Sequence, residues 1–260
     1  MELTSTSNWS DIAAWRKSER ARLVATRQGL SADHLRALND GITRALRNGL
    51  PVSRGCVIGF CWPFKAEYDA RHPLRYWRER GAEAALPEVV GKGQPLIFRR
   101  WWPGAPMKRG VYDIPYPDGT EVVVPDIALV PMNGCDDLGY RLGYGGGYFD
   151  RTLAQWRNRM IAIGVAFEAL RVPTIHPQPH DIPMDFIVTE AGLQRVAGGR
   201  LRLLDAGEAS AAVRSLMIAR KLPKAAPAGQ VEYASPPCFA GEYPGFFGDE
   251  PKAPPETPGN

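Results

Sequence analysis

The apolar residues of the chain recur at helical spacing in some stretches and form short continuous runs in others. Helical spacing predicts helices over residues 9–28 and 31–49, with Ser10 and Ser31 as candidate N-caps. Further helices are expected over residues 72–80 and 208–221 and beginning at Thr152. The polar side of the helix predicted over residues 9–28 is heavily basic.

Short apolar runs bounded by glycine and proline predict buried strands. They lie at residues 56–62, 83–87, 96–102, 126–132, 159–167 and 184–189, the last being the expected final strand of the domain. Strands that alternate with helices at this spacing favour a three-layer α/β/α domain with a mostly parallel, Rossmann-like sheet. Residues 103–119 are rich in Pro and Gly and are interpreted as an irregular binding loop or lid.

The domain is expected to span residues 10–197, with a short strand and helix extending it over residues 198–222. Residues 223–260 are dense in Pro and Gly and poor in large aliphatic residues, so they predict a mobile tail. The tail also carries aromatic residues that a pure linker does not need. The sequence leaves two roles open for this tail, which can dock onto the domain or bind a partner.

The composition, at 260 residues with 44% hydrophobic and 23% charged residues, is that of an ordinary globular protein. A formal net charge of +4 is too small to indicate nucleic-acid binding. No run approaches the roughly 20 apolar residues of a membrane span, and the first residues lack an apolar signal core. The four cysteines show no zinc-like spacing. We therefore expect a cytoplasmic protein that binds neither nucleic acid nor membrane.

A glycine-rich loop at residues 139–151 follows the predicted strand at 126–132 and precedes a predicted helix. Glycines free the backbone to adopt positive φ and bring N–H groups close to a ligand, and the following helix N-terminus favours an anion there. Arg141 and Arg151 flank the loop with positive charge. The pattern suits a polyphosphate, although a simple tight turn is equally open from the pattern alone. It is not a P-loop, because no Gly-Lys-Ser/Thr follows.

Two other segments hold candidate chemistry. The basic side of the first helix reads as a solvated face when taken alone. Glu67 follows the predicted strand at 56–62, with Trp62 and Phe64 close by in the sequence, where open α/β sheets place their ligands. A helix-entry carboxylate is the alternative reading of Glu67, and core packing is the alternative for the aromatic residues.

Together these pieces resemble the 5-formyltetrahydrofolate cyclo-ligase family, also called 5,10-methenyltetrahydrofolate synthetase. Residues 139–151, Gly-Tyr-Arg-Leu-Gly-Tyr-Gly-Gly-Gly-Tyr-Phe-Asp-Arg, are similar to its signature. Further similar segments, in the family's order, lie at residues 16–20, 64–69, 112–117, 164–168, 180–183 and 188–190. The similarity covers about residues 12–192. Ala66 stands where the family usually has Gly, and Leu170 stands where it usually has Gln.

The resemblance implies an enzyme that converts 5-formyltetrahydrofolate to 5,10-methenyltetrahydrofolate, using ATP as co-substrate and Mg²⁺. It assigns catalysis to Arg141, Glu67 and Asp150, with Asp150 also the Mg²⁺ ligand. It assigns ATP binding to Arg16, Lys17, Arg20, Arg141, Leu142, Gly143, Tyr144, Gly145, Gly146, Gly147, Tyr148 and Phe149. Arg22 and Arg27 remain interpreted as ordinary surface charge.

On the folate side, the resemblance places Glu67 at the substrate and has Trp62, Phe64 and Tyr112 wall the flat pterin by stacking. A paralogue that acts on another formylated or carboxylated small molecule is a second hypothesis, and Leu170 favours it. A nucleotide- or folate-binding regulatory protein without turnover is a third. The retained Arg20, Glu67, Arg141 and Asp150 speak against the third hypothesis.

Overall fold

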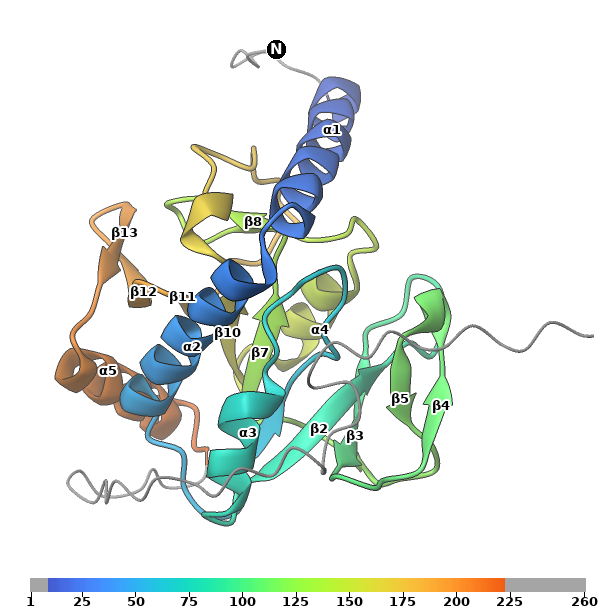
Figure 1. The fold of residues 1–260 in the computed structure, drawn as a ribbon, viewed down its shortest axis with the longest axis vertical. Coiled ribbons are helices and arrows are strands. Elements are labelled where there is room, and N and C mark those ends of the chain that lie inside the picture. The colour runs from blue at the N-terminus through green and yellow to red at the C-terminus, as the bar shows by residue number, and fades with distance from the viewer. Residues whose placement is uncertain (1–8, 223–260) are drawn as a thin grey trace, which may run out of the picture. The chain divides into compact units, whose positions relative to one another are not determined.

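The computed structural model of the protein describes residues 9–222 (Figure 1). Its helices are α1 Trp9–Gln28, α2 Ala32–Gly49, α3 Arg71–Arg78, α4 Tyr148–Trp156 and α5 Ala206–Ala219, with 3₁₀ turns η1 Val111–Asp113 and η2 Glu168–Leu170. Among these residues, no helix is both long enough and apolar enough to cross a membrane. The predicted tail at 223–260 lies outside the described residues.

A nine-stranded sheet forms the centre of the fold, in the order β13-β12-β11-β10-β7-β1-β2-β3-β6. Its strands are β1 Val57–Gly59, β2 Glu83–Glu88, β3 Ile97–Trp101, β6 Val122–Val123, β7 Ile127–Pro131, β10 Ile161–Val165, β11 Phe186–Thr189, β12 Gly192–Ala197 and β13 Arg200–Leu203. The strands from β11 to β2 run parallel, and antiparallel strands close both edges. The predicted mostly parallel sheet is confirmed.

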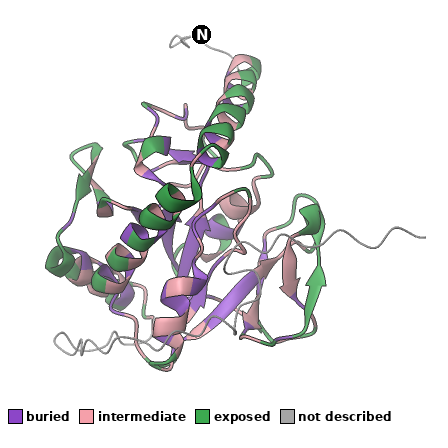
Figure 2. Cartoon of the chain, in the orientation of Figure 1, coloured by how far each residue is buried: buried purple, intermediate pink, exposed green. Residues whose placement is uncertain are grey.

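Helices cover both faces of this sheet (Figure 1). On one face α2 packs against β11 and β12, α3 against β2, and α5 against α2 and β12. On the other face Leu153 of α4 packs into an apolar cluster with Ala128 and Val130 of β7. Figure 2 shows the central strands buried between these layers. The three-layer α/β/α prediction is therefore confirmed.

Several local predictions differ from the structure. Residues 103–119 are not irregular throughout, because β4 Met107–Arg109 and β5 Pro115–Pro117 form an antiparallel hairpin there. β11 is not the final strand of the domain, since β12 follows it before residue 198, whereas β13 lies where the extension was expected to hold a short strand. Helix α4 begins at Tyr148 rather than Thr152, and Ser10 lies inside α1 instead of capping it. The missed strands β4, β5 and β12 are partly exposed, so they lack the apolar runs that marked the others.

A second hairpin, β8 Gly134–Cys135 and β9 Arg141–Leu142, carries the glycine loop away from β7. Helix α1 rests on this hairpin through Leu23, which is fully buried. A Cβ on Gly134 would lie 2.7 Å from Leu23 Cδ1 and 2.8 Å from the carbonyl oxygen of Leu170. The close approach of three segments thus requires glycine at position 134.

This requirement generates a stability prediction. Gly134→Ala should lower the free energy of unfolding by about 1–3 kcal/mol, because the new methyl group meets a backbone carbonyl that cannot move alone. Urea unfolding measures the effect. Gly91→Ala is the control, since its Cβ would meet only Gln94 Cγ, at 3.4 Å. Equal unfolding midpoints for the two variants would show that Leu23 and the carbonyl group of Leu170 leave room for a methyl group at position 134.

Candidate active site

A pocket of about 600 Å³ opens at the carboxyl ends of the parallel strands. Its wall includes Cys61 beyond β1, Pro87 and Val89 at the end of β2, and Pro131 at the end of β7. Further parts of the wall come from helix α1, residues 62–67, Leu96, residues 110–116 around the tip of the β4–β5 hairpin, the glycine loop and residues 180–181. Open α/β sheets bind ligands at this edge.

The glycine loop forms one wall of the pocket, between the end of β9 at Leu142 and the start of α4 at Tyr148. Gly145 and Gly147 have φ values of 92° and 63°, a left-handed conformation that favours glycine. Gly147 is the N-cap of α4 and has no side chain to accept from the first N–H groups of the helix. These N–H groups, together with the helix dipole, suit an anion in the pocket.

Arg20 of α1 reaches over this loop. Its Nε donates a hydrogen bond to the carbonyl oxygen of Gly143 at 2.7 Å, and its guanidinium packs against Gly145. Burial and the neighbouring charge of Arg16 both lower the pKa of Arg20. The charged form of Arg20 is therefore disfavoured by its surroundings, and an anion bound at the loop would stabilise it.

Two further arginines in the pocket wall are paired with carboxylates. Arg141 forms an ion pair with Asp150 at 2.9 Å, and Asp150 also accepts a hydrogen bond from the N–H of Ile182. Arg16 is paired with Asp181 at 2.5 Å and donates to the carbonyl oxygens of Ile175 and His176. The two ion pairs hold the segment around residues 175–182 against α1 and α4.

Glu67 belongs to a buried polar cluster with Tyr144 of the glycine loop and Arg27 of α1. The Tyr144 hydroxyl donates to Glu67 Oε1 at 2.7 Å, and Arg27 Nη2 donates to that hydroxyl at 2.9 Å. Arg27 Nη2 also lies 3.7 Å from Glu67 Oε1. Arg27 is only 2% exposed. The earlier interpretation of Arg27 as surface charge is wrong.

Arg27 also fixes the backbone of the segment that carries Glu67. Its Nε donates to the carbonyl oxygen of Lys65 at 2.8 Å. Lys65 and Ala66 have φ values of 50° and 58°, a conformation that costs a non-glycine residue free energy. Burial raises the pKa of Glu67, while the Tyr144 hydrogen bond and the Arg27 charge oppose that rise. Arg27 therefore favours both the loop conformation and the ionised form of the carboxyl.

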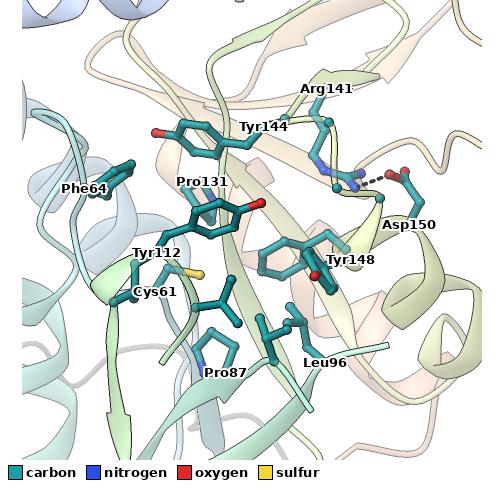
Figure 3. A pocket seen from close by; sticks show the side chains of 18 of the residues that line it. Cys61, Phe64, Pro87, Leu96, Tyr112, Pro131, Arg141, Tyr144, Tyr148 and Asp150 are labelled. Carbon is teal, nitrogen blue, oxygen red and sulfur yellow. Dashed lines mark ion pairs between the residues drawn. The ribbon is translucent and has the colours of Figure 1, made fainter. Parts of the chain in front are cut away.

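Aromatic side chains line the part of the pocket next to Glu67 (Figure 3). Phe64 and Tyr144 lie with ring centroids 5.9 Å apart. Tyr112, at the tip of the hairpin, is 69% exposed, and its ring points into the cavity toward Tyr148. Trp62 lies under the guanidinium of Arg71, 4.6 Å from its ring centroid. This arrangement can hold a flat ring system beside a carboxylate.

Most residues predicted for the site line this one pocket: Arg16, Arg20, Trp62, Phe64, Glu67, Tyr112 and every residue from Arg141 to Asp150. Lys17 is exposed and does not line it. The sequence interpretation missed Arg27, although Ile12, Arg16, Leu23 and Arg27 are the buried residues of α1. Their spacing of four, seven and four residues places Arg27 on the buried face, and that was the available signal.

Asp150, the predicted magnesium ligand, is a carboxylate of the pocket wall beside the glycine loop and is paired with Arg141. Within residues 9–222 there is no group of three or more His, Cys, Asp and Glu side chains that could hold a metal by itself. Mg²⁺ commonly takes one or two carboxylates and completes its shell with phosphate oxygens and water. A pocket carboxylate beside an anion cradle suits that mode of binding.

Leu170 lies behind the pocket rather than in its wall. It is 1% exposed and lines a separate cavity of about 10 Å³ together with Arg27, Glu67 and Met132. Such a cavity is about the size of one water molecule. Leu170 therefore forms part of the wall of the small cavity beside the buried Arg27–Glu67 pair.

Solved structures share this fold. The structure of Aquifex aeolicus 5,10-methenyltetrahydrofolate synthetase matches with a TM-score of 0.60 and 28% identity, over 73% of this chain and 97% of that one. Two curated relatives are named 5-formyltetrahydrofolate cyclo-ligase. The Haemophilus influenzae protein is 36% identical over 65% of this chain and 94% of its own length. The Mycolicibacterium smegmatis protein is 29% identical over 59% of this chain and 84% of its own length.

The glycine loop, the paired arginines and the Glu67 segment all fall inside the region that matches a known family. The model of the 5-formyltetrahydrofolate cyclo-ligase family matches residues 12–190, which is more than half of the chain. This chain belongs to the 5-formyltetrahydrofolate cyclo-ligase family.

Proposed function

We propose that the protein converts 5-formyltetrahydrofolate to 5,10-methenyltetrahydrofolate at the expense of ATP, with Mg²⁺ bound alongside the phosphates. The observation that supports this most strongly is that one pocket holds both an anion cradle and an aromatic, carboxylate-bearing end. An enzyme that must bring a triphosphate to a flat heterocycle needs both features within reach of each other. Family membership supports the reaction itself.

The chemistry follows from the poor reactivity of a formamide. In the proposed reaction the formyl oxygen attacks the γ-phosphorus of ATP, and ADP leaves with the electrons of the broken P–O bond. The formyl carbon is then electrophilic, and N10 of the same substrate attacks it. That attack closes the ring. The N10 proton is then lost and the C–O bond breaks as inorganic phosphate leaves, which gives the methenyl product. The protein's tasks are alignment of the two substrates and stabilisation of phosphate charge.

The cationic wall of the pocket is suited to the triphosphate. The N–H groups of the glycine loop and the first turn of α4, with Arg20 beside them, would bind phosphate oxygens. Arg141, held in place by Asp150, would neutralise charge that develops on the transferred group. Asp150 would hold Mg²⁺, which supplies further neutralisation of phosphate charge when bound.

The other end of the pocket is suited to the folate. Glu67 keeps unused lone pairs on both carboxylate oxygens, because each accepts one hydrogen bond within the protein. It would accept from N–H donors of the pterin. Phe64, Tyr112 and Trp62 would cover the ring faces. Tyr144 contacts Glu67 from the glycine loop, so the two substrate sites share a residue.

No observation favours a different substrate as strongly. Leu170 motivated a paralogue with another formylated or carboxylated substrate, yet its side chain lines the small cavity rather than the pocket. A regulatory protein without turnover has no need for both ends of the pocket. We retain the folate cyclo-ligase reaction as the proposed function.

The activity itself is directly testable. Purified protein mixed with 5-formyltetrahydrofolate and Mg·ATP should form methenyltetrahydrofolate, followed by its absorbance, and should release one phosphate per product. Omission of ATP or chelation of Mg²⁺ should abolish the signal. Folded protein that binds ATP but forms no product would contradict the proposed substrate.

Loss of either partner of the ion pair at the glycine loop should abolish most turnover. We expect Arg141→Ala and Asp150→Ala each to lower kcat/KM by about 100-fold or more, the magnitude seen when a group that stabilises transition-state charge is removed. Arg157→Ala, at an exposed position just beyond α4, is the matched control and should retain activity. Near-normal rates in either pocket variant would remove that residue from the phosphate site.

The Arg27 contact predicts a pH effect. If ionised Glu67 binds the substrate, the rate falls as pH falls through the pKa of Glu67. Arg27 opposes the rise of that pKa, so Arg27→Met should raise it and move the acid limb of kcat/KM to higher pH. The pH–rate profile is the measurement. Arg22→Met, on the exposed side of α1, is the control. A uniform loss of rate at every pH would mean that Arg27 serves only the structure.

A further inference from the structure

Trp9, at the start of α1, is an exposed tryptophan that lines the pocket. Its side chain is 53% exposed, whereas Trp77 and Trp101 of the core are almost fully buried. It precedes residue 12, where the match to the family begins. Trp9 is therefore a pocket residue to which neither the sequence interpretation nor the family match assigns a role.

The helix places Trp9 in line with the cationic residues of the pocket. Trp9, Ala13, Arg16 and Arg20 all line it, at spacings of four, three and four residues. Such spacing keeps side chains on one face of a helix, and Trp9 lies about 10 Å along the axis from Arg16. The small side chain of Ala13 leaves space between the indole and the arginines.

The indole also contacts two other residues of the pocket wall. His180, which lines the pocket as well, meets it edge-on with ring centroids 5.9 Å apart and an interplanar angle of 79°. The guanidinium of Arg16 lies 5.8 Å from the centroid of the Trp9 ring. Arg16 thus lies over one face of the indole, while 53% of Trp9 stays exposed, so the ring still offers surface on which a flat ligand can stack.

We propose that Trp9 is the stacking platform for the purine base of the nucleotide. This inference rests on the proposed use of ATP. With the phosphates at the glycine loop and Arg20, the base extends along α1 toward its N-terminus and lies against the indole. The aromatic residues near Glu67 are left to the second substrate. Because a purine covers more of an indole than a pyrimidine does, Trp9 also favours ATP over UTP.

Calorimetric titration with two ligands separates the base from the phosphates. ATP carries both, and inorganic tripolyphosphate carries only the phosphates. Trp9→Leu should weaken ATP binding about tenfold, as expected for loss of one base–aromatic stack, and leave tripolyphosphate binding unchanged. The same variant should narrow the preference for ATP over UTP. Trp9→Phe should retain most of the ATP affinity.

Trp102→Leu is the matched control, since Trp102 is 40% exposed and does not line the pocket. It should bind both ligands as the unaltered protein does. Unchanged ATP affinity in Trp9→Leu would overturn the proposal. An equal loss for ATP and tripolyphosphate would also overturn it, because Trp9 would then act only by placing Arg16. If the unaltered protein binds neither ligand, the proposed function fails and this inference fails with it.

Discussion

The active site depends on one buried arginine. Arg27 donates to Tyr144, to the carbonyl oxygen of Lys65 and, at 3.4 Å, to that of Met132, while its charge opposes the rise in the pKa of Glu67. These contacts tie α1, the Glu67 segment, the glycine loop and the end of β7 together. A buried ion pair seldom adds net stability, yet removal of one partner costs about 3–5 kcal/mol because a charge is left unpaired. The pair is thus better explained by the geometry it imposes than by stability.

The sheet was predictable because its central strands carry a signal that does not depend on distant residues. Ile161–Val165 is buried at every position, and Ile127–Pro131 at four of its five, so both read as apolar runs. The edges were less predictable. The β4–β5 hairpin exposes all three residues of Met107–Arg109, and β12 buries only two of its six residues, so neither has a clear apolar pattern. Their pairing is decided by backbone hydrogen bonds and by neighbours far along the chain.

The same distinction holds for the site. The glycine loop is recognisable locally, since consecutive glycines before a helix mark a candidate anion cradle, although the pattern alone leaves a tight turn equally open. The roles of the arginines on α1 depend on partners elsewhere. Lys17 and Arg16 are adjacent and both positively charged, yet only Arg16 is buried, where it meets Asp181 and two carbonyl oxygens. Charge alone therefore could not separate the pocket-lining residues of this helix from the exposed ones.

The buried contacts of Arg16 also affect the order in which parts of the domain can form. Its partners Ile175, His176 and Asp181 follow it by 159 to 165 residues. During synthesis α1 emerges first, and its arginine-bearing face has no acceptors until almost the whole domain has been made. Contacts of such long range are entropically expensive to close and slow to form. The end of the pocket that we propose for the nucleotide is consequently expected to be among the last parts of the nascent protein to assemble.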